Sequence, residues 1–237
     1  MNDQRSTNGA EGGRDERLAP ALGPELLVER LGRVSYAAAH AHQRSALEQR
    51  VAERTPDRLI LLEHEEVVTL GRRTRDSEFG RAELELAGLP VVEVERGGEA
   101  TWHGPGQLVA YPVVRLPEGR RDLHLYLRDL EQVVIEVLAE LGVTGSRREG
   151  LTGVWVGLRK VSSIGVAVRR WTTWHGVSLN VTNASDRFAS FRPCGLDPGS
   201  MTRVADHAAV PEDDPLLEWA FERAFRSVFG YPAGSVR

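Results

Sequence analysis

Hydrophobic residues recur along three stretches of the chain at spacings that predict helices. In residues 34–53 and 121–141, leucines, valines and aromatics return every three or four positions, which is typical of an amphipathic helix packed on a core. Gly142 directly follows the second stretch and suits the position after a helix C-terminus. A third helix is predicted to begin at Asp214, a preferred N-cap, and to end at Gly230.

Shorter apolar runs between these helices predict strands. They span residues 59–62, 67–70, 91–95, 108–114, 154–158, 161–168 and 175–181. Arg159 and Lys160 separate two of the runs, which predicts a hairpin with Lys160 at or beside its turn. Strict alternation in the last run predicts that His175 shares a face with Val177 and Leu179. Strands grouped between helices favour an α+β fold with a central mixed, largely antiparallel sheet flanked by helices.

The length and composition indicate one globular domain. A chain of 237 residues suffices for one well-buried core. We therefore predict a disordered N-terminal tail over residues 1–20 and a single domain over residues 21–237. Residues 1–17 are polar and lack the apolar core of a secretion signal. No apolar run approaches the roughly 20 residues that span a bilayer, so we expect a cytoplasmic protein that does not bind membranes.

The net charge of −4 and the pI of about 6.0 argue against nucleic-acid binding, which usually requires a strongly basic surface. Several arginines nevertheless lie close together in short segments of the sequence. We expect some of these arginines to form a basic patch for an acidic partner, and the alternative is that they only keep the surface soluble. They are Arg72, Arg73, Arg75, Arg147, Arg148, Arg169 and Arg170.

Two residues stand out as candidates for chemistry. Cys194 is the only cysteine, so it forms no internal disulfide and no cysteine-rich zinc site; it is either a buried filler or a functional thiol. Lys160 is the only lysine among 30 basic residues, and an amine can lose its proton where a guanidinium cannot. A cation near Cys194 would favour its thiolate; Lys160 is the best candidate, ahead of His103 and His175.

Residues 96–107 form the densest cluster of glycine and polar side chains. Four glycines between two predicted strands allow the backbone to approach a ligand closely. The segment lacks both nucleotide-binding glycine patterns, G-x-x-x-x-G-K-[ST] and G-x-G-x-x-G, so it gives no support to nucleotide binding. An ordinary hairpin loop is the plain alternative.

Four segments together resemble the lipoyl(octanoyl) transferase family. They are Arg96-Gly97-Gly98 with Thr101 and His103-Gly104-Pro105-Gly106-Gln107; Lys160 with Ile164-Gly165; His175-Gly176 with Asn180; and Pro193-Cys194-Gly195. The resemblance extends from the first predicted helix to about Arg203. It implies a biotin/lipoate protein ligase-like fold and makes residues 21–237 a single octanoyltransferase catalytic domain.

The resemblance also implies a reaction. An octanoyl group would pass from octanoyl-acyl carrier protein to a lysine of a lipoyl domain, in 2-oxoacid dehydrogenase E2 subunits or the glycine cleavage H protein, without cofactor, metal or ATP. Cys194 would carry the acyl group as a thioester, and Lys160 would lower the thiol pKa and act as general base. The residues implied to bind substrate are Arg96, Gly97, Gly98, Glu99, Ala100, Thr101, Trp102, His103, Ser163, Ile164, Gly165, Gly176, Val177 and Ser178.

Two departures from the family pattern leave the preferred acyl chain length open. Trp102 replaces a frequent tyrosine, and Ser162 and Ser163 replace small apolar residues. Three other functions stay open at this point: an ATP-dependent lipoate or biotin ligase of the same fold, a non-catalytic acyl- or lipoyl-binding module, and a cysteine hydrolase.

Overall fold

A computed structural model describes residues 23, 25–74, 88–184, 187, 196–211 and 215–234. The strands of its main sheet are β1 (Leu26–Val34), β2 (Asp57–His64), β6 (Gln107–Val113), β7 (Ser146–Arg148), β8 (Leu151–Val156), β9 (Arg159–Arg169) and β10 (Thr172–Asn180). They lie in the order β1-β2-β6-β10-β9-β8-β7. Only β1 and β2 run parallel to each other, and every other neighbouring pair is antiparallel. The predicted mixed, largely antiparallel sheet is confirmed.

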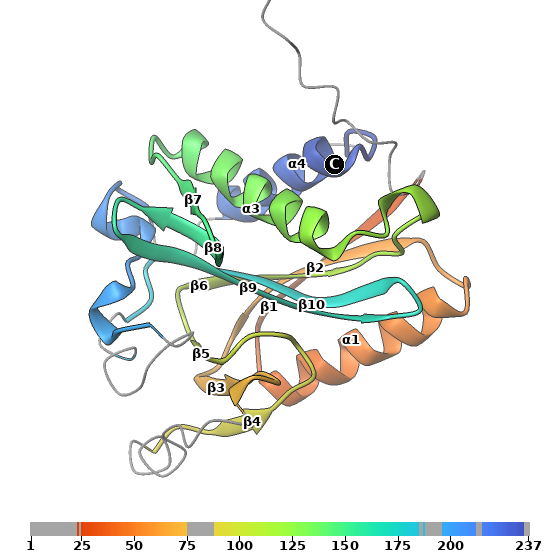
Figure 1. Ribbon diagram of the computed structural model, residues 1–237, viewed down its shortest axis with the longest axis horizontal. Helices are drawn as coiled ribbons and strands as arrows, with labels where there is room; N and C mark the ends of the chain where they lie inside the picture. The colour runs from red at the N-terminus through yellow and green to blue at the C-terminus, as the bar shows by residue number, and fades with distance from the viewer. Residues whose placement is uncertain are drawn as a thin grey trace, which may run out of the picture.

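Helices cover both faces of this sheet. They are α1 (Tyr36–Val51), α3 (Leu123–Glu140) and α4 (Pro215–Phe229), with short 3-10 turns η2 (Glu118–Arg120), η5 (Pro198–Ser200) and η6 (Val204–Asp206). Figure 1 shows α3 and α4 on one face and α1 on the other. A second sheet of β3 (Val67–Leu70), β4 (Val91–Glu93) and β5 (Ala100–His103) lies on the α1 side, in the order β4-β3-β5. The α+β class is confirmed.

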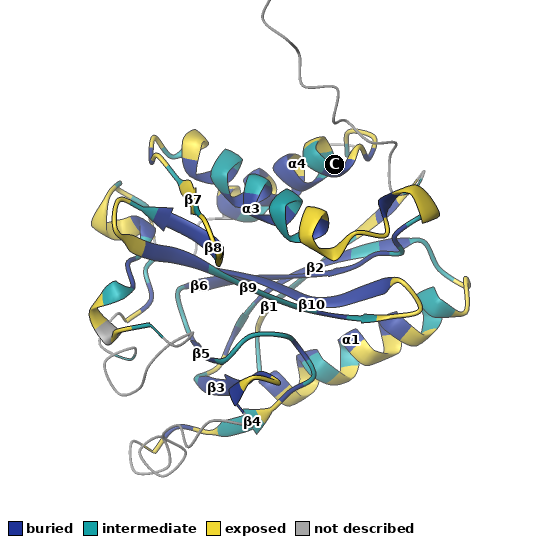
Figure 2. Cartoon of the chain, viewed as in Figure 1, coloured by how far each residue is buried: buried dark blue, intermediate teal, exposed yellow. Residues whose placement is uncertain are grey.

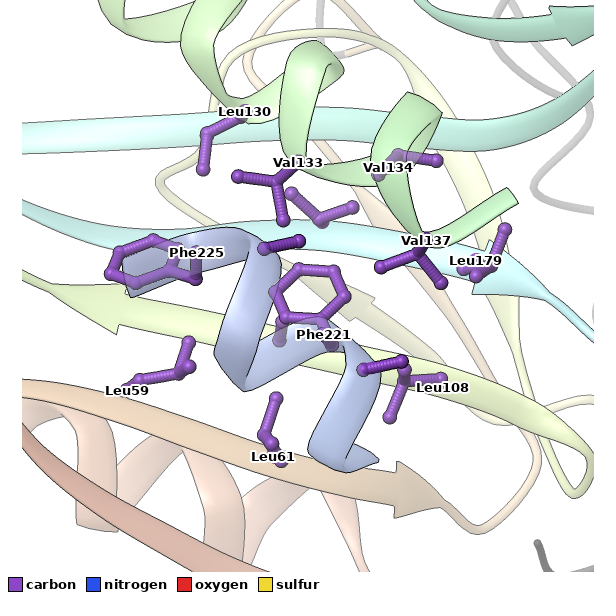
Figure 3. Close-up of a cluster of buried hydrophobic side chains, with 14 of the residues drawn as sticks. Leu59, Leu61, Leu108, Leu130, Val133, Val134, Val137, Leu179, Phe221 and Phe225 are labelled. Atoms are coloured by element: carbon purple, nitrogen blue, oxygen red, sulfur yellow. The ribbon is translucent and has the colours of Figure 1, made fainter. Parts of the chain in front are cut away.

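The larger core fills the space between the main sheet and the helices α3 and α4. Val133 and Val137 of α3 meet Phe221 and Phe225 of α4, and both pairs pack over Leu61 of β2 (Figure 3). All five side chains are fully buried, and each such burial stabilises the fold by about 1.5–3 kcal/mol. Figure 2 shows that both helices bury one side and leave the other exposed.

Local sequence signals explain the helix ends. The Asp122 side chain accepts hydrogen bonds from the backbone amides of His124 and Leu125 at the start of α3. Gly142 follows its end with φ of 72°, a conformation that favours glycine. The third predicted helix is α4, and its predicted N-cap, Asp214, lies outside the described residues. No helix in the part of the chain described here is long and apolar enough to cross a membrane.

Three sequence predictions differ from the structure. β1 was not predicted, because it is an edge strand with Leu26 as its only buried residue and therefore has no strong apolar alternation. The second half of the predicted glycine-rich loop contains β5, which pairs antiparallel with β3. The predicted β8–β9 hairpin is confirmed with Lys160 beside its turn, but the turn is made by Gly157 and Leu158, so Arg159 and Lys160 already belong to β9. Gly157 has φ of 57°, which suits a tight turn.

Candidate active site

A cavity of about 350 Å³ lies between the small sheet and strands β8 to β10. Its size falls in the usual range for a small-molecule site. Most of the predicted site residues line it: Arg96, Gly98, Glu99, Thr101, His103, Lys160, Ser163, Ile164, Gly165, Gly176, Val177 and Ser178. Gly97, Ala100 and Trp102 are not among its lining residues.

The alternation of β5 explains which of its residues reach the cavity. Thr101 and His103 point into it, whereas Ala100 and Trp102 belong to a separate apolar cluster that includes Met201. Trp102 is only 1% exposed. Trp102, which departs from the frequent tyrosine of the family pattern, therefore packs behind the cavity wall and does not line the cavity.

Glycines let the Arg96 segment lie directly on β9. The backbone amide of Gly97 donates to the carbonyl of Val166 at 2.9 Å. A Cβ at Gly165 would stand 2.9 Å from the Gly97 carbonyl oxygen and 3.0 Å from Cδ of Arg96, and Gly176 is paired with Gly165 on the next strand. A Cβ at Gly176 would clash with the Ala110 carbonyl oxygen. Gly165 and Gly176 are therefore required by close backbone approach, and they leave one side of the cavity walled by main chain.

Lys160 places an amine at the cavity from the second position of β9. Its side chain is 5% exposed, and Nζ lies 5.2 Å from the centroid of the Trp155 ring. The aliphatic part passes over Gly153, where a Cβ would stand 2.6 Å from Cε of Lys160 and φ is 128°. Among the residues that the structure describes, no carboxylate lies within ion-pair distance of Nζ.

Cys194, the other half of the predicted dyad, lies outside the described residues. The described chain resumes at Leu196, which lines the cavity two positions after Cys194 in the sequence. The distance between the thiol and the Lys160 amine is therefore still a prediction.

His175 lies on the opposite face of β10 from the one predicted. Val177 belongs to the core under α3 and α4, but the His175 ring lies on the α1 side, 4.3 Å from the ring of Trp174 and 6.0 Å from that of His40. The cause is a φ of 56° at His175, which interrupts the strand alternation. The backbone amide of His175 donates to Oε1 of Gln43 at 3.0 Å.

Burial keeps the imidazoles around the cavity neutral. It lowers the pKa of His64 to about 4, of His175 to about 3, and of His103 well below the usual value. His64 donates from Nδ1 to the Val34 carbonyl at 3.3 Å, so its Nε2 accepts from the Tyr111 hydroxyl at 2.7 Å. Of these three rings, His103 and His175 line the cavity, and neither adds positive charge to it.

Among the described residues, His40, Glu95 and His175 form a group that could hold a metal ion. Their ligand atoms all lie within 4.8 Å of one another, and Nε2 of His175 has no hydrogen-bond partner. The positive charges of Arg96 and Arg72 lower the pKa of His175, after burial, and the same field opposes the binding of a cation. The metal-free reaction stays a prediction.

Sequence reasoning missed several cavity residues: Tyr36, Thr69, Tyr111, Leu151, Thr152 and Trp155. Tyr36 and Tyr111 are almost fully buried, and burial raises the pKa of both phenols. The available signal was the hydroxyl of each tyrosine, a polar group in otherwise apolar surroundings. This signal is weak, because both residues have the sequence context of ordinary core aromatics.

Only part of the predicted arginine patch lies near the cavity. Arg73 lines it with a side chain that is 72% exposed, and the Arg148 guanidinium lies 5.9 Å from the ring of Trp155. Arg169 and Arg170 do not flank the Lys160 hairpin as predicted; they sit at the β9–β10 turn, about 30 Å along the strand. Arg75 lies outside the described residues.

Arg147 and Arg72 complete the predicted set. Arg147 is an ion-pair partner of the buried Glu131 and also donates to Gln132, so it serves the packing of α3. The backbone amide of Arg72 donates to the Arg96 carbonyl at 3.1 Å. Arg72 is exposed, and its charge acts on His175 in the cavity. Arg72, Arg73 and Arg148 therefore remain as candidate cations at the cavity rim.

Comparisons with known proteins agree with this geometry. Residues 35–225 match the lipoyl protein ligase A/B catalytic domain. The octanoyltransferase of Gloeobacter violaceus is 45% identical over 207 residues, which cover 86% of this chain and 91% of that protein. The octanoyltransferase of Nocardia farcinica is 42% identical over 209 residues, 84% of this chain and 81% of that protein.

The fold is shared with solved ligases. A bipartite lipoate protein ligase from Thermoplasma acidophilum has a TM-score of 0.70 at 16% identity, covering 90% of this chain and 86% of that one. The predicted biotin/lipoate protein ligase-like fold is therefore confirmed. The chain belongs to the lipoyl protein ligase A/B catalytic-domain family and, within it, to the octanoyltransferases.

Proposed function

We propose that this octanoyltransferase moves an octanoyl group from octanoyl-acyl carrier protein to a lysine of a lipoyl domain, through a thioester on Cys194. Acyl transfer follows from membership of the family. The covalent intermediate, the carrier and the acceptors are the proposed part. The acceptors would be lipoyl domains of 2-oxoacid dehydrogenase E2 subunits and the glycine cleavage H protein.

The observation that carries the mechanism is Lys160. The single lysine among 30 basic residues lies at the cavity and is almost fully buried. Its amine can exchange a proton, whereas the guanidinium of an arginine cannot. Leu196 lines the same cavity two positions after Cys194, which supports a pairing of this amine with the thiol. A nearby ammonium favours the thiolate, which is the nucleophilic form.

The reaction then proceeds in two displacements. The Cys194 thiolate attacks the carbonyl carbon of the donor thioester, the bond from that carbon to the carrier sulfur breaks, and the carrier leaves as a thiol with a proton from Lys160. The acceptor amine next attacks the new thioester and gives a proton to the neutral Lys160 amine, and the carbon–Sγ bond breaks to leave the amide. Thioester exchange is nearly balanced and amide formation is favourable, so no nucleotide is required.

The lining of the cavity suits both parts of this substrate. Leu151, Trp155, Ile164 and Val177 supply apolar surface for the acyl chain. Thr101, His103, Ser178 and the backbone around Gly165 supply polar groups near the reacting carbonyl. We propose that Arg96 to His103, Ser163 to Gly165 and Gly176 to Ser178 bind the acyl substrate from these positions, except where a side chain points away, as that of Trp102 does.

Intact-mass spectrometry after mixing with octanoyl carrier protein tests the mechanism. Because Cys194 is the only cysteine, we expect one octanoyl adduct per chain, which hydroxylamine removes and Cys194→Ser lacks. The Cys194→Ser chain should also keep its melting temperature, since the two side chains are similar in size. Near-normal turnover by Cys194→Ser, or no adduct on the unmodified chain, would disprove the covalent step.

Two further predictions accompany this proposal. The reaction should proceed without added nucleotide and in the presence of a metal chelator, which the same transfer assay tests directly. A requirement for ATP with free octanoate would favour a ligase. Cell fractionation tests the predicted cytoplasmic location.

A further inference from the structure

Two buried amides of the matching motifs have no part in the mechanism above. Gln107 is 1% exposed and Asn180 is 2% exposed, and neither lines the cavity. Gln107 donates from Nε2 to Oδ1 of Asn180 at 2.9 Å, which links β6 to β10. This contact therefore lies behind the cavity wall.

Backbone carbonyls at both ends determine the orientation of these amides. Gln107 Nε2 also donates to the carbonyl of Trp102 at 3.2 Å, and Asn180 Nδ2 donates to the carbonyl of Thr202 at 3.0 Å. A carbonyl only accepts, so both amide nitrogens must face these oxygens. The oxygen of Gln107 therefore faces His103, and that of Asn180 faces Gln107.

The hydrogen bonds upstream of Gln107 run in the same donor-to-acceptor direction and begin at the polar residues of the cavity wall. His103 donates from Nδ1 to Oε1 of Gln107 at 2.7 Å, which leaves Nε2 of this neutral ring as an acceptor. Thr69 Oγ1 lies 3.4 Å from that nitrogen and itself accepts from Arg96 at 2.8 Å. Every donor from Arg96 to Asn180 thus points the same way.

Downstream, the chain of hydrogen bonds reaches the strand of Lys160. The backbone amide of Thr202 donates to the Lys160 carbonyl at 2.9 Å, and Met201 forms a parallel bridge with Lys160. Asn180 thus holds the segment that lies along the base of the Lys160 side chain. Six hydrogen bonds in one direction join Arg96 to Lys160.

We propose that Gln107 and Asn180 are positioning residues for the Lys160 amine. They fix the tautomer of His103 and hold residues 201–202 against β9, so that Lys160 and the polar wall keep one relative placement. The inference rests on the proposed function of Lys160 as the base. It assigns a role to the Gln107 and Asn180 motif positions that is distinct from substrate contact.

Replacing each amide by the acid of the same shape removes its N–H donors and interrupts this series of hydrogen bonds. Gln107→Glu keeps the acceptor for His103 and loses the donor to Asn180; Asn180→Asp keeps the acceptor for Gln107 and loses the donor to Thr202. Each should lower kcat roughly 10-fold to 100-fold, the equivalent of one lost buried hydrogen bond. KM for the carrier-bound donor should change by less than about twofold, because neither amide lines the cavity or contacts substrate.

A spectroscopic readout reports on Lys160 independently of turnover. Since Lys160 is the only lysine, protein labelled with ε-¹³C lysine gives one ε-methylene signal. This signal should shift or broaden in both variants. Should Asn180→Asp fail to fold, Asn180→Ser removes the bond to Thr202 without adding a charge.

Thr173→Val is the matched control on the same strand. Thr173 is fully buried in β10 and donates to the Pro112 carbonyl at 3.0 Å, about 23 Å along the strand from Asn180. The control should lose comparable thermal stability while keeping kcat and the Lys160 signal.

Three results would overturn the inference. They are unchanged kcat in both chain variants, a loss of kcat no greater than in Thr173→Val at equal melting temperature, or an unmoved Lys160 signal. If the unmodified chain fails to transfer octanoate, the proposed function fails instead, and the Lys160 signal still decides whether Gln107 and Asn180 position the amine.

Discussion

Three buried imidazoles should make the folded chain sensitive to mild acid. Burial lowers the pKa of His64 to about 4 and of His175 to about 3, and it holds that of His103 well below the usual 6.5. In the unfolded chain the same three side chains return to that ordinary value. Below pH 6.5 the unfolded state therefore binds protons that the folded state refuses.

The sign and size of the effect follow from this difference. The free energy of unfolding should be fully retained above about pH 6.5 and should fall as the pH drops toward the folded-state values. His64 and His175 each contribute a loss of about 1.4 kcal/mol per pH unit, hence about 2 kcal/mol each at pH 5 and about 4 kcal/mol together, and His103 adds a further loss of the same sign. That loss is comparable to the whole stability of many domains.

Urea unfolding between about pH 7 and pH 5, followed by the fluorescence of the five tryptophans, measures this loss. His64→Gln should reduce it by about 2 kcal/mol, because a glutamine can still donate to Val34 and accept from Tyr111 but does not titrate. The matched control is His124→Gln, whose side chain is exposed on α3. A stability independent of pH over this range, or an identical loss in His64→Gln, would refute the argument.

Lys160→Arg should lower kcat about as far as Lys160→Ala, by roughly 100-fold or more, because a guanidinium keeps the charge and cannot accept the proton; full activity in Lys160→Arg would reduce the lysine to an electrostatic partner. Gly153→Ala should destabilise the chain by about 1–3 kcal/mol and lower kcat, because its Cβ would meet Cε of Lys160 and the backbone carbonyl of Ser162; an unchanged melting temperature would contradict this. Arg73→Glu with Arg148→Glu should raise KM for octanoyl carrier protein at unchanged kcat, and raising salt from about 0.05 to about 0.5 M should do the same to the unmodified enzyme; a KM that ignores both would leave these arginines as solubilising residues.

The helices were predictable because their signals are local. In α3, the N-cap Asp122, the apolar spacing and Gly142 all lie within one stretch of sequence, so no distant partner is needed to recognise them. β1 and β5 differ, since their pairing with β2 and β3 is what makes them strands. A half-exposed edge strand such as β1 has too few buried positions for alternation to appear in sequence.

The site was predictable where chemistry leaves a mark on composition. Lys160 stood out as the only lysine, and its place at the cavity agrees with that signal. The face of His175 was not predictable, because a single residue with positive φ reverses the alternation and has no sequence signature at a histidine. Tyr36 and Tyr111 reach the cavity through tertiary packing alone, from α1 and β6.

The spacing of the matching motifs reflects two tasks carried out by neighbouring residues. Arg96, His103 and Lys160 present side chains to the cavity, whereas Gly165 permits close backbone approach and Gln107 bonds behind the wall. A catalytic amine loses efficiency when it is displaced by as little as about 1 Å. A residue that only holds the wall can therefore matter to turnover as much as one that touches substrate, and the proposed positioning role accounts for buried amides in the motif beside cavity-lining groups.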